Sequence, residues 1–327
     1  MILDGRDDAA IALAADRLAA GEPVAFATET VYGLGARADD DAAVGRIFAL
    51  KGRPASHPLI VHVAERAGAD AFAAAMPRLA ERLTEALWPG PLTVIVARRE
   101  GVAAAAAAGQ PTIALRCPAH PLAHALLQAA AARGVAGIAA PSANRFGRVS
   151  PTTAAHVEAE FGPDLLIVDG GACRVGIESA IVDCTGEWPV LLRPGTLTAA
   201  RIESAAGAPL AGARADSPRA PGTLASHYAP RATVRIMTGA MLRAALGILG
   251  AEALDLAVYS RSVPSGVATG VRHRRMPARP EQAAHELFAV LRELDGEGVH
   301  LIWVEEPPEG PEWDGVRDRL RRAAGGL

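Results

Sequence analysis

Apolar and polar positions along the chain form short blocks that predict strands and helices in alternation. Before residue 207, the predicted helices cover residues 7–20, 76–87, 120–133, 151–161 and 198–206, and another helix carries Lys51. The predicted strands cover residues 22–30, 58–63, 91–98, 111–117, 135–140, 165–169, 178–184 and 189–193. Because some strands follow one another without a helix between them, the pattern predicts an α/β fold with a mixed sheet and flanking helices.

The composition changes after residue 206. Residues 207–231 are rich in Gly, Pro, Ala and Ser and show no period, which predicts a linker. Beyond it, strands are predicted over 232–237, 254–260, 270–276 and 299–305, and helices over 239–249, 280–295 and 313–324. For a chain of 327 residues, we therefore expect a first domain over 1–206, the linker over 207–231 and a smaller α/β domain over 232–327.

Charge and cysteine content narrow the function classes. The net charge is −3, which gives no overall attraction to nucleic acid or to an anionic membrane. The acidic N-terminus does not have the layout of a signal peptide, and no apolar run is long enough to span a bilayer. The three cysteines Cys117, Cys173 and Cys184 share no metal-binding spacing, so we expect a cytoplasmic protein without a metal site.

Lys51 is the single lysine among the 33 basic residues of the chain. It stands seven residues after Val44 in an i, i+3, i+4, i+7 pattern, so it shares the apolar face of its predicted helix. Gly52 predicts the end of this helix, and Arg53 adds a second cation there. A compact ammonium beside a guanidinium suits a phosphate. The alternative is a lysine that only complements the helix dipole in the last turn.

Two further polar segments follow predicted strands. In an extended chain, Thr28, Thr30 and Tyr32 share one face and Glu29 points to the other. After strand 135–140, the sequence PSAN and the glycines that follow suit a phosphate or ribose site at the end of the strand. The alternative there is an ordinary turn with a helix N-cap at Ser150 or Thr152.

Several charged side chains lie in predicted strands. Arg116 ends an otherwise apolar strand, where its charge needs a partner. That partner is either a small carboxylate ligand or a structural salt bridge. Arg193 repeats this arrangement, and His57 and His62 have no zinc spacing. In the linker, the aromatic pair His227 and Tyr228 is typical of a docking contact, and we expect a lid there.

Taken in order, these motifs resemble the YrdC-like family in its long two-domain form, that of the threonylcarbamoyl-AMP synthases. The resemblance covers residues 8–206, continues with APGTLASHYAP in the linker and extends into the C-terminal part. It implies a YrdC-like twisted mixed sheet, joined by an extended linker to a smaller Rossmann-like α/β domain. The motifs are TETVYGLG, KGRP, HPLIVHV, WPGPLTVI, TIALRCP, APSAN, SPTTAAHV, ESAIVD and LRPG.

The resemblance also implies a reaction. L-threonine and bicarbonate or CO2 give a carbamate, which attacks the α-phosphate of ATP and releases pyrophosphate. The expected enzyme is thus an L-threonylcarbamoyladenylate synthase, a nucleotidyltransferase that uses Mg2+ with ATP. A downstream tRNA threonylcarbamoyltransferase complex would pass the group to the adenosine beside the anticodon of ANN-decoding tRNAs (t6A), and a weak tRNA contact is compatible with this role.

The roles of single residues are implied by position. The implied catalytic residues are Lys51, Arg53, Ser142 and Asn144. The implied threonine pocket consists of Thr30, His62, Arg116, Ala140 and Ser179. The implied nucleotide site consists of Lys51, Arg53, His57, Thr112, Ser142, Ser150, Arg193 and Tyr228. The family usually has Asn at the position of His57. A non-catalytic RNA-binding YrdC-like module is the alternative, against which the net acidity and the aromatic content of 4% count.

Overall fold

The protein consists of two compact units. The computed structural model describes residues 1–214, 216–249, 255–266, 268 and 270–325. The first unit is formed by Met1–Phe146 and Ser150–Thr223, and the second by Gly147–Val149 and Leu224–Leu327. The short segment Gly147–Val149 thus belongs to the second unit, although the residues on both sides of it belong to the first.

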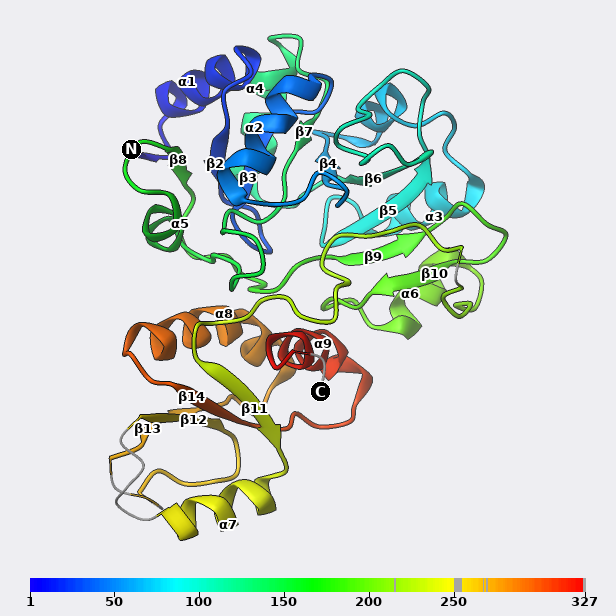
Figure 1. Cartoon of the computed structure of the whole chain (residues 1–327). Helices are drawn as coiled ribbons and strands as arrows, with labels where there is room; N and C mark the ends of the chain where they lie inside the picture. Colours follow the sequence, from blue (N-terminus) through cyan, green and yellow to red (C-terminus); the bar gives the residue numbers. More distant parts are fainter. Residues whose placement is uncertain (215, 250–254, 267, 269, 326–327) are drawn as a thin grey trace. The chain divides into compact units, whose positions relative to one another are not determined.

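A mixed sheet forms the centre of the first unit (Figure 1). Among the described residues it has ten strands in the order β1-β8-β2-β3-β7-β4-β6-β5-β9-β10. The strands are β1 (Ile2–Asp4), β2 (Val24–Phe26), β3 (Gly33–Arg37), β4 (Ile60–His62), β5 (Leu92–Ala97), β6 (Thr112–Arg116), β7 (Ile138–Ala139), β8 (Leu166–Asp169), β9 (Ala180–Asp183) and β10 (Val190–Arg193). The parallel pairs β4–β6 and β5–β9 alternate with antiparallel pairs, which confirms the predicted mixed sheet.

The helices of the first unit begin and end where the sequence supplies caps. The carboxylate of Asp40 accepts hydrogen bonds from the first turn of α2, and Gly52 ends this helix with a φ of 60°. Both observations agree with the helix predicted for Lys51. The helices are α1 (Asp8–Ala19), α2 (Asp41–Lys51), α3 (Arg78–Leu87), α4 (Pro121–Ala131), α5 (Ala154–Phe161) and α6 (Ala199–Ala206), with a short 3-10 helix at Arg66–Ala71.

The helices divide between the two faces of the sheet. Because side chains alternate along a strand, Phe26 packs on one face and its neighbour Ala25 on the other. Helices α1 and α4 cover the face of Phe26, over the strands from β8 to β7. Helices α2, α3, α5 and α6 cover the opposite face, whose core includes Ile47 of α2. Each face is therefore apolar, as a sheet packed on both sides requires.

The face of Phe26 continues over β4, β6, β5 and β9. There a small apolar cluster, Ile60, Ala114, Ile95 and Ile181, packs against Ala220 of the segment that precedes the second unit. This segment is also fixed by hydrogen bonds, from the Ala211 N–H to Pro189 O (2.8 Å) and from the Arg219 N–H to Gln110 Oε1 (2.9 Å). The first half of the predicted linker therefore lies along the first unit.

The second unit contains a four-stranded parallel sheet among its described residues, in the order β11-β14-β12-β13. Helix α7 lies on one side of this sheet and helices α8 and α9 lie on the other (Figure 1). This alternation of strands and helices confirms the predicted Rossmann-like α/β unit. The elements are β11 (Thr233–Met237), α7 (Gly239–Leu249), β12 (Leu256–Ser260), β13 (Arg272–Arg275), α8 (Pro280–Gly296), β14 (Leu301–Glu305), a 3-10 helix (Pro311–Trp313) and α9 (Asp314–Ala323).

The structure differs from the prediction in two strands that were not predicted and in the ends of several others. Strands β1 and β3 were not predicted, because β1 has three residues and β3 begins at a glycine, where the sequence indicates a turn. The predicted strand 22–30 ends at Phe26, and 135–140 is reduced to Ile138–Ala139. The predicted strand 254–260 begins outside the described residues.

Gly137→Ala tests the packing of the core of the first unit. A Cβ added at Gly137 would lie 2.6 Å from a ring atom of Phe72, which is fully buried. The substitution should lower the free energy of unfolding by about 1–3 kcal/mol, because a packed core resists extra volume. The matched control is Gly186→Ala, where an added Cβ has no atom within 4 Å. Equal stability of the two variants in urea unfolding would contradict this packing.

Candidate functional site

A row of polar side chains crosses the sheet on the face of Phe26, in the part that α1 and α4 do not cover. In the strand register, His62 of β4 lies beside Arg116 of β6, and Arg116 lies beside Thr93 of β5. Residues in register on neighbouring strands project from the same face, so the three side chains form a row. All three are buried. Buried polar groups require partners, and their partners define the candidate site.

The guanidinium of Arg116 is held by the turn that follows β2. Its Nη1 donates to Thr30 Oγ1 (2.9 Å), and its Nη2 lies 2.7 Å from Glu29 Oε1 in a buried ion pair. The structure thus contains the salt bridge that was one of the two alternatives for Arg116. The prediction that Glu29 points away from Thr30 was wrong. The cause is Thr28, whose Oγ1 accepts hydrogen bonds from the N–H groups of Thr30 and Val31 and bends the chain into a turn.

Burial and the charge of Arg116 shift the pKa values of Glu29 and His62. Burial alone would raise the pKa of the Glu29 carboxyl, but the Arg116 guanidinium outweighs burial and the pKa is lowered. Burial and the nearby Arg116 charge lower the pKa of His62 to about 3. His62 is therefore neutral at physiological pH, and Arg116 is the cation of this part of the site.

The row continues through hydroxyl groups to β9 and β10. Thr93 Oγ1 and Ser179 Oγ share a hydrogen bond of 2.8 Å. Arg193 donates from Nε to Ser179 O (3.0 Å) and from Nη1 to Pro221 O (3.0 Å). Ala140 lies at the other end of the row, where its N–H donates to Ile60 O (2.9 Å). Of the residues expected to bind threonine, Thr30, His62 and Arg116 are thus in direct contact or in register, and Ser179 joins them through Thr93.

Lys51 joins helix α2 to the loop that follows β7. Its side chain is 3% exposed, so the prediction that it shares the buried face of the helix is confirmed. The ammonium donates to the carbonyl oxygen of Ser142 (2.6 Å) and to that of Asn144. Burial and the charge of Arg53 hold the pKa of Lys51 well below its usual value, and Glu160 and Glu178 oppose this effect.

Phe146 connects Lys51 with Arg53 and His57, two other residues of the predicted nucleotide site. Its N–H donates to Lys51 O (2.9 Å). Its ring lies under the guanidinium of Arg53, 5.7 Å from the centroid, and meets the ring of His57 edge to face at 5.3 Å. Arg53 also donates to Pro58 O (3.0 Å). Burial and the charge of Arg53 lower the pKa of His57.

Ser150 belongs to the same site and is not a helix cap. Its hydroxyl donates to the carboxylate of Glu178, and both residues are buried. Thr153 caps helix α5 instead, by accepting from the His156 N–H (3.3 Å). The alternative that Ser150 or Thr152 serves as N-cap was therefore wrong.

Two further residues were predicted to bind the nucleotide. Thr112 is the first residue of β6 and Arg116 is the last, so the length of the strand separates them. Tyr228 belongs to the second unit, where it is buried against Phe288, 5.4 Å between ring centroids, and lies 5.4 Å below Arg319. A nucleotide contact of either residue stays a prediction.

The sequence reasoning did not include four residues that the structure brings into the site. They are Glu29, whose direction was wrong, and Thr93, Phe146 and Glu178. Thr93 had a usable signal, a hydroxyl inside the apolar run LTVIVA. The other contacts depend on residues distant in sequence.

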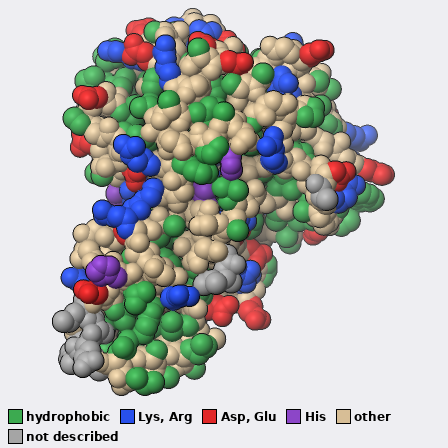
Figure 2. All heavy atoms as spheres, in the orientation of Figure 1, with side chains coloured by type: hydrophobic (Ala, Val, Ile, Leu, Met, Phe, Trp, Pro, Cys, Tyr) green, Lys and Arg blue, Asp and Glu red, His purple; other side chains and the backbone are tan. Residues whose placement is uncertain are grey.

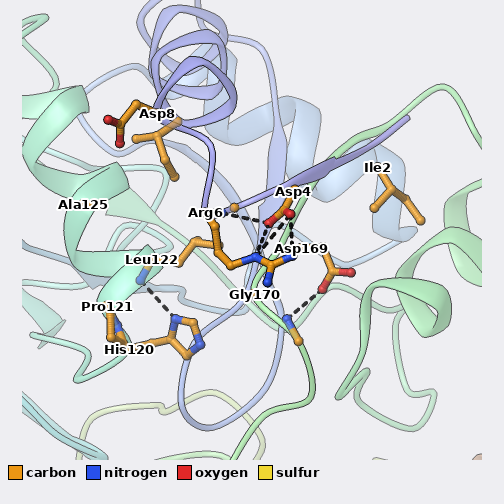
Figure 3. A pocket seen from close by; sticks show the side chains of 13 residues that line it. Ile2, Asp4, Arg6, Asp8, His120, Pro121, Leu122, Ala125, Asp169 and Gly170 are labelled. Atoms are coloured by element: carbon orange, nitrogen blue, oxygen red, sulfur yellow. Dashed lines mark hydrogen bonds and ion pairs between the residues drawn. The ribbon is translucent and has the colours of Figure 1, made fainter.

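A separate pocket of 780 Å³ opens beside β1 and the N-terminus of α4 (Figure 3). The described residues that line it include none of the predicted site residues. Three of its charged groups have partners within the protein: Arg6 pairs with Asp4 (2.7 Å), and Asp169 accepts from the hydroxyl of Tyr32 (2.7 Å). This pocket is therefore the weaker candidate for chemistry.

Neither a cluster of metal ligands nor a membrane-spanning helix is found among the described residues. Within the described part of the chain, no group of three or more His, Cys, Asp or Glu residues is arranged to hold a metal ion. No helix in the same part combines the length and apolar character needed to cross a bilayer.

Comparisons with known proteins cover nearly the whole chain. A family profile for Sua5, YciO and YrdC, described as "Telomere recombination", matches residues 16–195. A profile described as "Threonylcarbamoyl-AMP synthase, C-terminal domain" matches residues 197–325.

Two curated relatives and one solved structure agree with these profiles. The chain is 40% identical to the threonylcarbamoyl-AMP synthase of Pyrococcus abyssi, over 96% of this chain and 94% of that protein. It is 37% identical to the threonylcarbamoyl-AMP synthase of Bacillus subtilis, over 98% and 94% of the two chains. The crystal structure of P. abyssi Sua5 complexed with L-threonine superimposes with a TM-score of 0.87 and 37% identity, covering 97% and 94%.

His62→Gln tests the buried row through the pH dependence of stability. An unfolded histidine ionises near pH 6.5, and His62 in the folded chain has a pKa of about 3. Between these values the unfolded state binds more protons, so the free energy of unfolding falls as the pH is lowered. The variant lacks this contribution and should lose less stability between pH 7 and pH 4 in urea titrations.

The matched control for this measurement is His124→Gln, on α4 of the same unit. It leaves His62 in place, so the contribution of His62 to the pH dependence should remain. If His62→Gln loses as much stability as the original protein over this interval, then His62 is not held neutral by its surroundings.

Proposed function

Since the chain belongs to the Sua5, YciO and YrdC family and carries the C-terminal domain of threonylcarbamoyl-AMP synthases, we propose that it is an L-threonylcarbamoyladenylate synthase. L-Threonine, bicarbonate and ATP would give threonylcarbamoyl-AMP, pyrophosphate and water. In this nucleotidyl transfer the threonine nitrogen takes up carbon dioxide, and a carbamate oxygen then attacks the α-phosphorus of ATP.

The observation that carries this proposal is the buried guanidinium of Arg116. It is 4% exposed, and Glu29 and Thr30 fix two of its nitrogens. Its Nε makes no hydrogen bond to any residue of the described chain. A carboxylate is the natural partner for such an N–H, and the threonine substrate carries one. The neutral His62 and the hydroxyl of Ser179 are the neighbours that would contact the rest of a small hydroxy amino acid.

The triphosphate would bind beside Lys51 and Arg53. An ammonium has three hydrogens, and Ser142 O and Asn144 O accept two of them from Lys51. The third would point to a phosphate oxygen, and Arg53 would add a second positive charge. His57 contacts the ring of Phe146, which lies under Arg53. Ser150 and Arg193, like Thr112 and Tyr228, are proposed as nucleotide contacts from the family resemblance.

The reaction mainly requires the protein to orient the substrates and to stabilise negative charge. Attack on the α-phosphorus needs the carbamate held in line with the leaving pyrophosphate, and bound orientation supplies a large part of the rate. Lys51 and Arg53 would stabilise the charge that develops on the phosphate oxygens. Asn144 would act by ordering the loop that carries Ser142, since its N–H donates to Ser142 O (3.0 Å).

Magnesium would arrive with the nucleotide. Mg2+ at ATP sites is held largely by phosphate oxygens and water, with one or two carboxylates. The described residues offer no cluster of three ligands, and the carboxylate of Glu178 already accepts from Ser150. Magnesium would therefore enter the site as part of the nucleotide substrate.

The product would pass to a tRNA threonylcarbamoyltransferase complex. Its threonylcarbamoyl group would be transferred to the adenosine beside the anticodon of ANN-decoding tRNAs. A cytoplasmic location fits this role, and the three cysteines are free and buried, as expected in a reducing compartment.

The second candidate is a YrdC-like module that binds RNA without catalysis. Nucleic-acid binding depends strongly on a field of positive charge. The net charge is −3, and acidic and basic side chains are interspersed on the face seen in Figure 2. These features favour the synthase.

The direct test is an assay with purified protein, ATP, L-threonine and 13C-labelled bicarbonate. We expect pyrophosphate release that requires threonine, and a product whose mass contains the labelled carbon. Binding of tRNA without this turnover would instead support the RNA-binding module.

Arg116→Lys tests the carboxylate clamp. Lysine keeps the charge beside Glu29 but loses the Nε–H and the planar fork. A hydrogen bond to a charged group contributes about 1.5–3 kcal/mol, so KM for threonine should rise roughly 10- to 100-fold while KM for ATP changes little. Arg37→Lys, at an ion pair with Asp39 in the same unit, is the matched control. A rise in KM for ATP alone would contradict the assignment.

Lys51→Arg tests the need for an ammonium. The longer planar group cannot reach both carbonyl oxygens from the same place, so kcat/KM should fall about 100-fold, the order found for loss of one oriented charge donor. Arg46→Lys on the exposed side of the same helix is the control and should keep full activity. Near-normal turnover of Lys51→Arg would mean that any positive charge suffices there.

A further inference from the structure

The segment Gly147–Val149 is held by residues that follow residue 223 in the sequence. It belongs to the second unit, whereas the residues on both sides of it belong to the first. The Ala229 N–H donates to Gly147 O (2.9 Å), and Arg148 and Ala229 form a parallel β-bridge. This backbone contact fixes one end of the segment.

Helix α8 supplies the side-chain contacts. Arg148 Nη2 donates to Asp295 Oδ2 at 3.1 Å, and Arg292 donates to the carbonyl oxygen of Val149. Asp295 is 8% exposed, whereas the side chain of Arg148 is 34% exposed. A half-buried ion pair and a charged donor on a backbone carbonyl are stronger than ordinary surface contacts.

Asp295 also fixes the start of the second unit's sheet. Its Oδ1 accepts from the Ala232 N–H (2.9 Å), and its Oδ2 lies 3.3 Å from Nε of Arg231. The same carboxylate thus orders the entry into β11 and the segment Gly147–Val149. Loss of Arg148 alone would leave Asp295 with its other partners, so the fold of the unit does not depend on this one contact.

Both ends of the segment are bonded directly to residues of the candidate site. Phe146 precedes Gly147, and it donates to Lys51 O and lies under Arg53. Ser150 follows Val149 and donates to Glu178. Three residues span at most about 10 Å, so fixing the segment limits where Phe146 and Ser150 lie.

We propose that Arg148, Asp295 and Arg292 are positioning residues, through which the C-terminal domain orders the loop that carries the nucleotide-binding residues between Asn144 and Ser150. This inference rests on the proposed function for its kinetic part. It gives the C-terminal domain a specific task, which is to fix three backbone positions between Phe146, which contacts Lys51 and Arg53, and Ser150, which donates to Glu178.

The experiment compares Arg148→Gln and Asp295→Asn with the original protein. The matched control is Glu293→Gln on the same helix, which removes an exposed ion pair with Arg274. Residues in contact are energetically coupled, so we expect KM for ATP to rise about fivefold in Arg148→Gln with KM for threonine unchanged. The effect of Asp295→Asn should be at least as large, and the control should match the original protein.

Hydrogen exchange provides a readout that does not require activity. In Arg148→Gln the amides of residues 146–150 should exchange about fivefold faster, while those of α8 and β11 keep their rates and the melting temperature stays unchanged. Faster exchange throughout the second unit would indicate a merely structural role and overturn the proposal. So would unchanged exchange at 146–150.

The two readouts separate this inference from the proposed function. If the original protein makes no threonylcarbamoyl-AMP, the proposed function fails, but faster local exchange at 146–150 still supports the positioning role. If the original protein is active and both variants keep their KM for ATP, the positioning role is wrong and the proposed function stands.

Discussion

The hydrogen bonds of the Lys51 ammonium to two backbone carbonyl oxygens are the interaction on which the candidate site depends. A buried ammonium is costly unless acceptors surround it, and here the acceptors belong to the loop after β7. The helix end at Gly52 brings the ammonium to this loop, and the carbonyl of Lys51 itself accepts from the Phe146 N–H. One residue thus fixes the loop from its side chain and from its backbone.

The part of the proposed site that would bind threonine also contains a buried charge that needs a partner. Arg116 is buried in an apolar sheet and is compensated by Glu29, which the turn at Thr28 directs toward it. Breaking a buried ion pair on one side leaves an uncompensated charge, which costs more than the pair contributes. Glu29 therefore allows the guanidinium to be present before a substrate carboxylate binds, and the strand register places His62 and Thr93 on both sides of it.

Local sequence patterns predicted much of this arrangement. The contacts between residues distant in the sequence could not be predicted from such patterns. The 3.6 period and Gly52 predicted that Lys51 is buried at a helix end, and the mixed sheet followed from the order of the strands. The direction of Glu29 was wrong because a side-chain hydrogen bond of Thr28 overrides the strand alternation. The partner of Arg116 stayed open, since it depends on residues more than 80 positions away in the sequence. The membership of Gly147–Val149 in the second unit has no local signal at all.

Lys51 is the only lysine of the chain, so its side chain can be observed directly in protein labelled with 15N and 13C on lysine. In the free protein this account predicts one signal that titrates well below the usual lysine value of 10.5. A non-hydrolysable ATP analogue should shift that signal and raise its pKa, because phosphate favours the charged form. A signal that titrates at the usual value and does not shift when the ATP analogue is added would contradict the account.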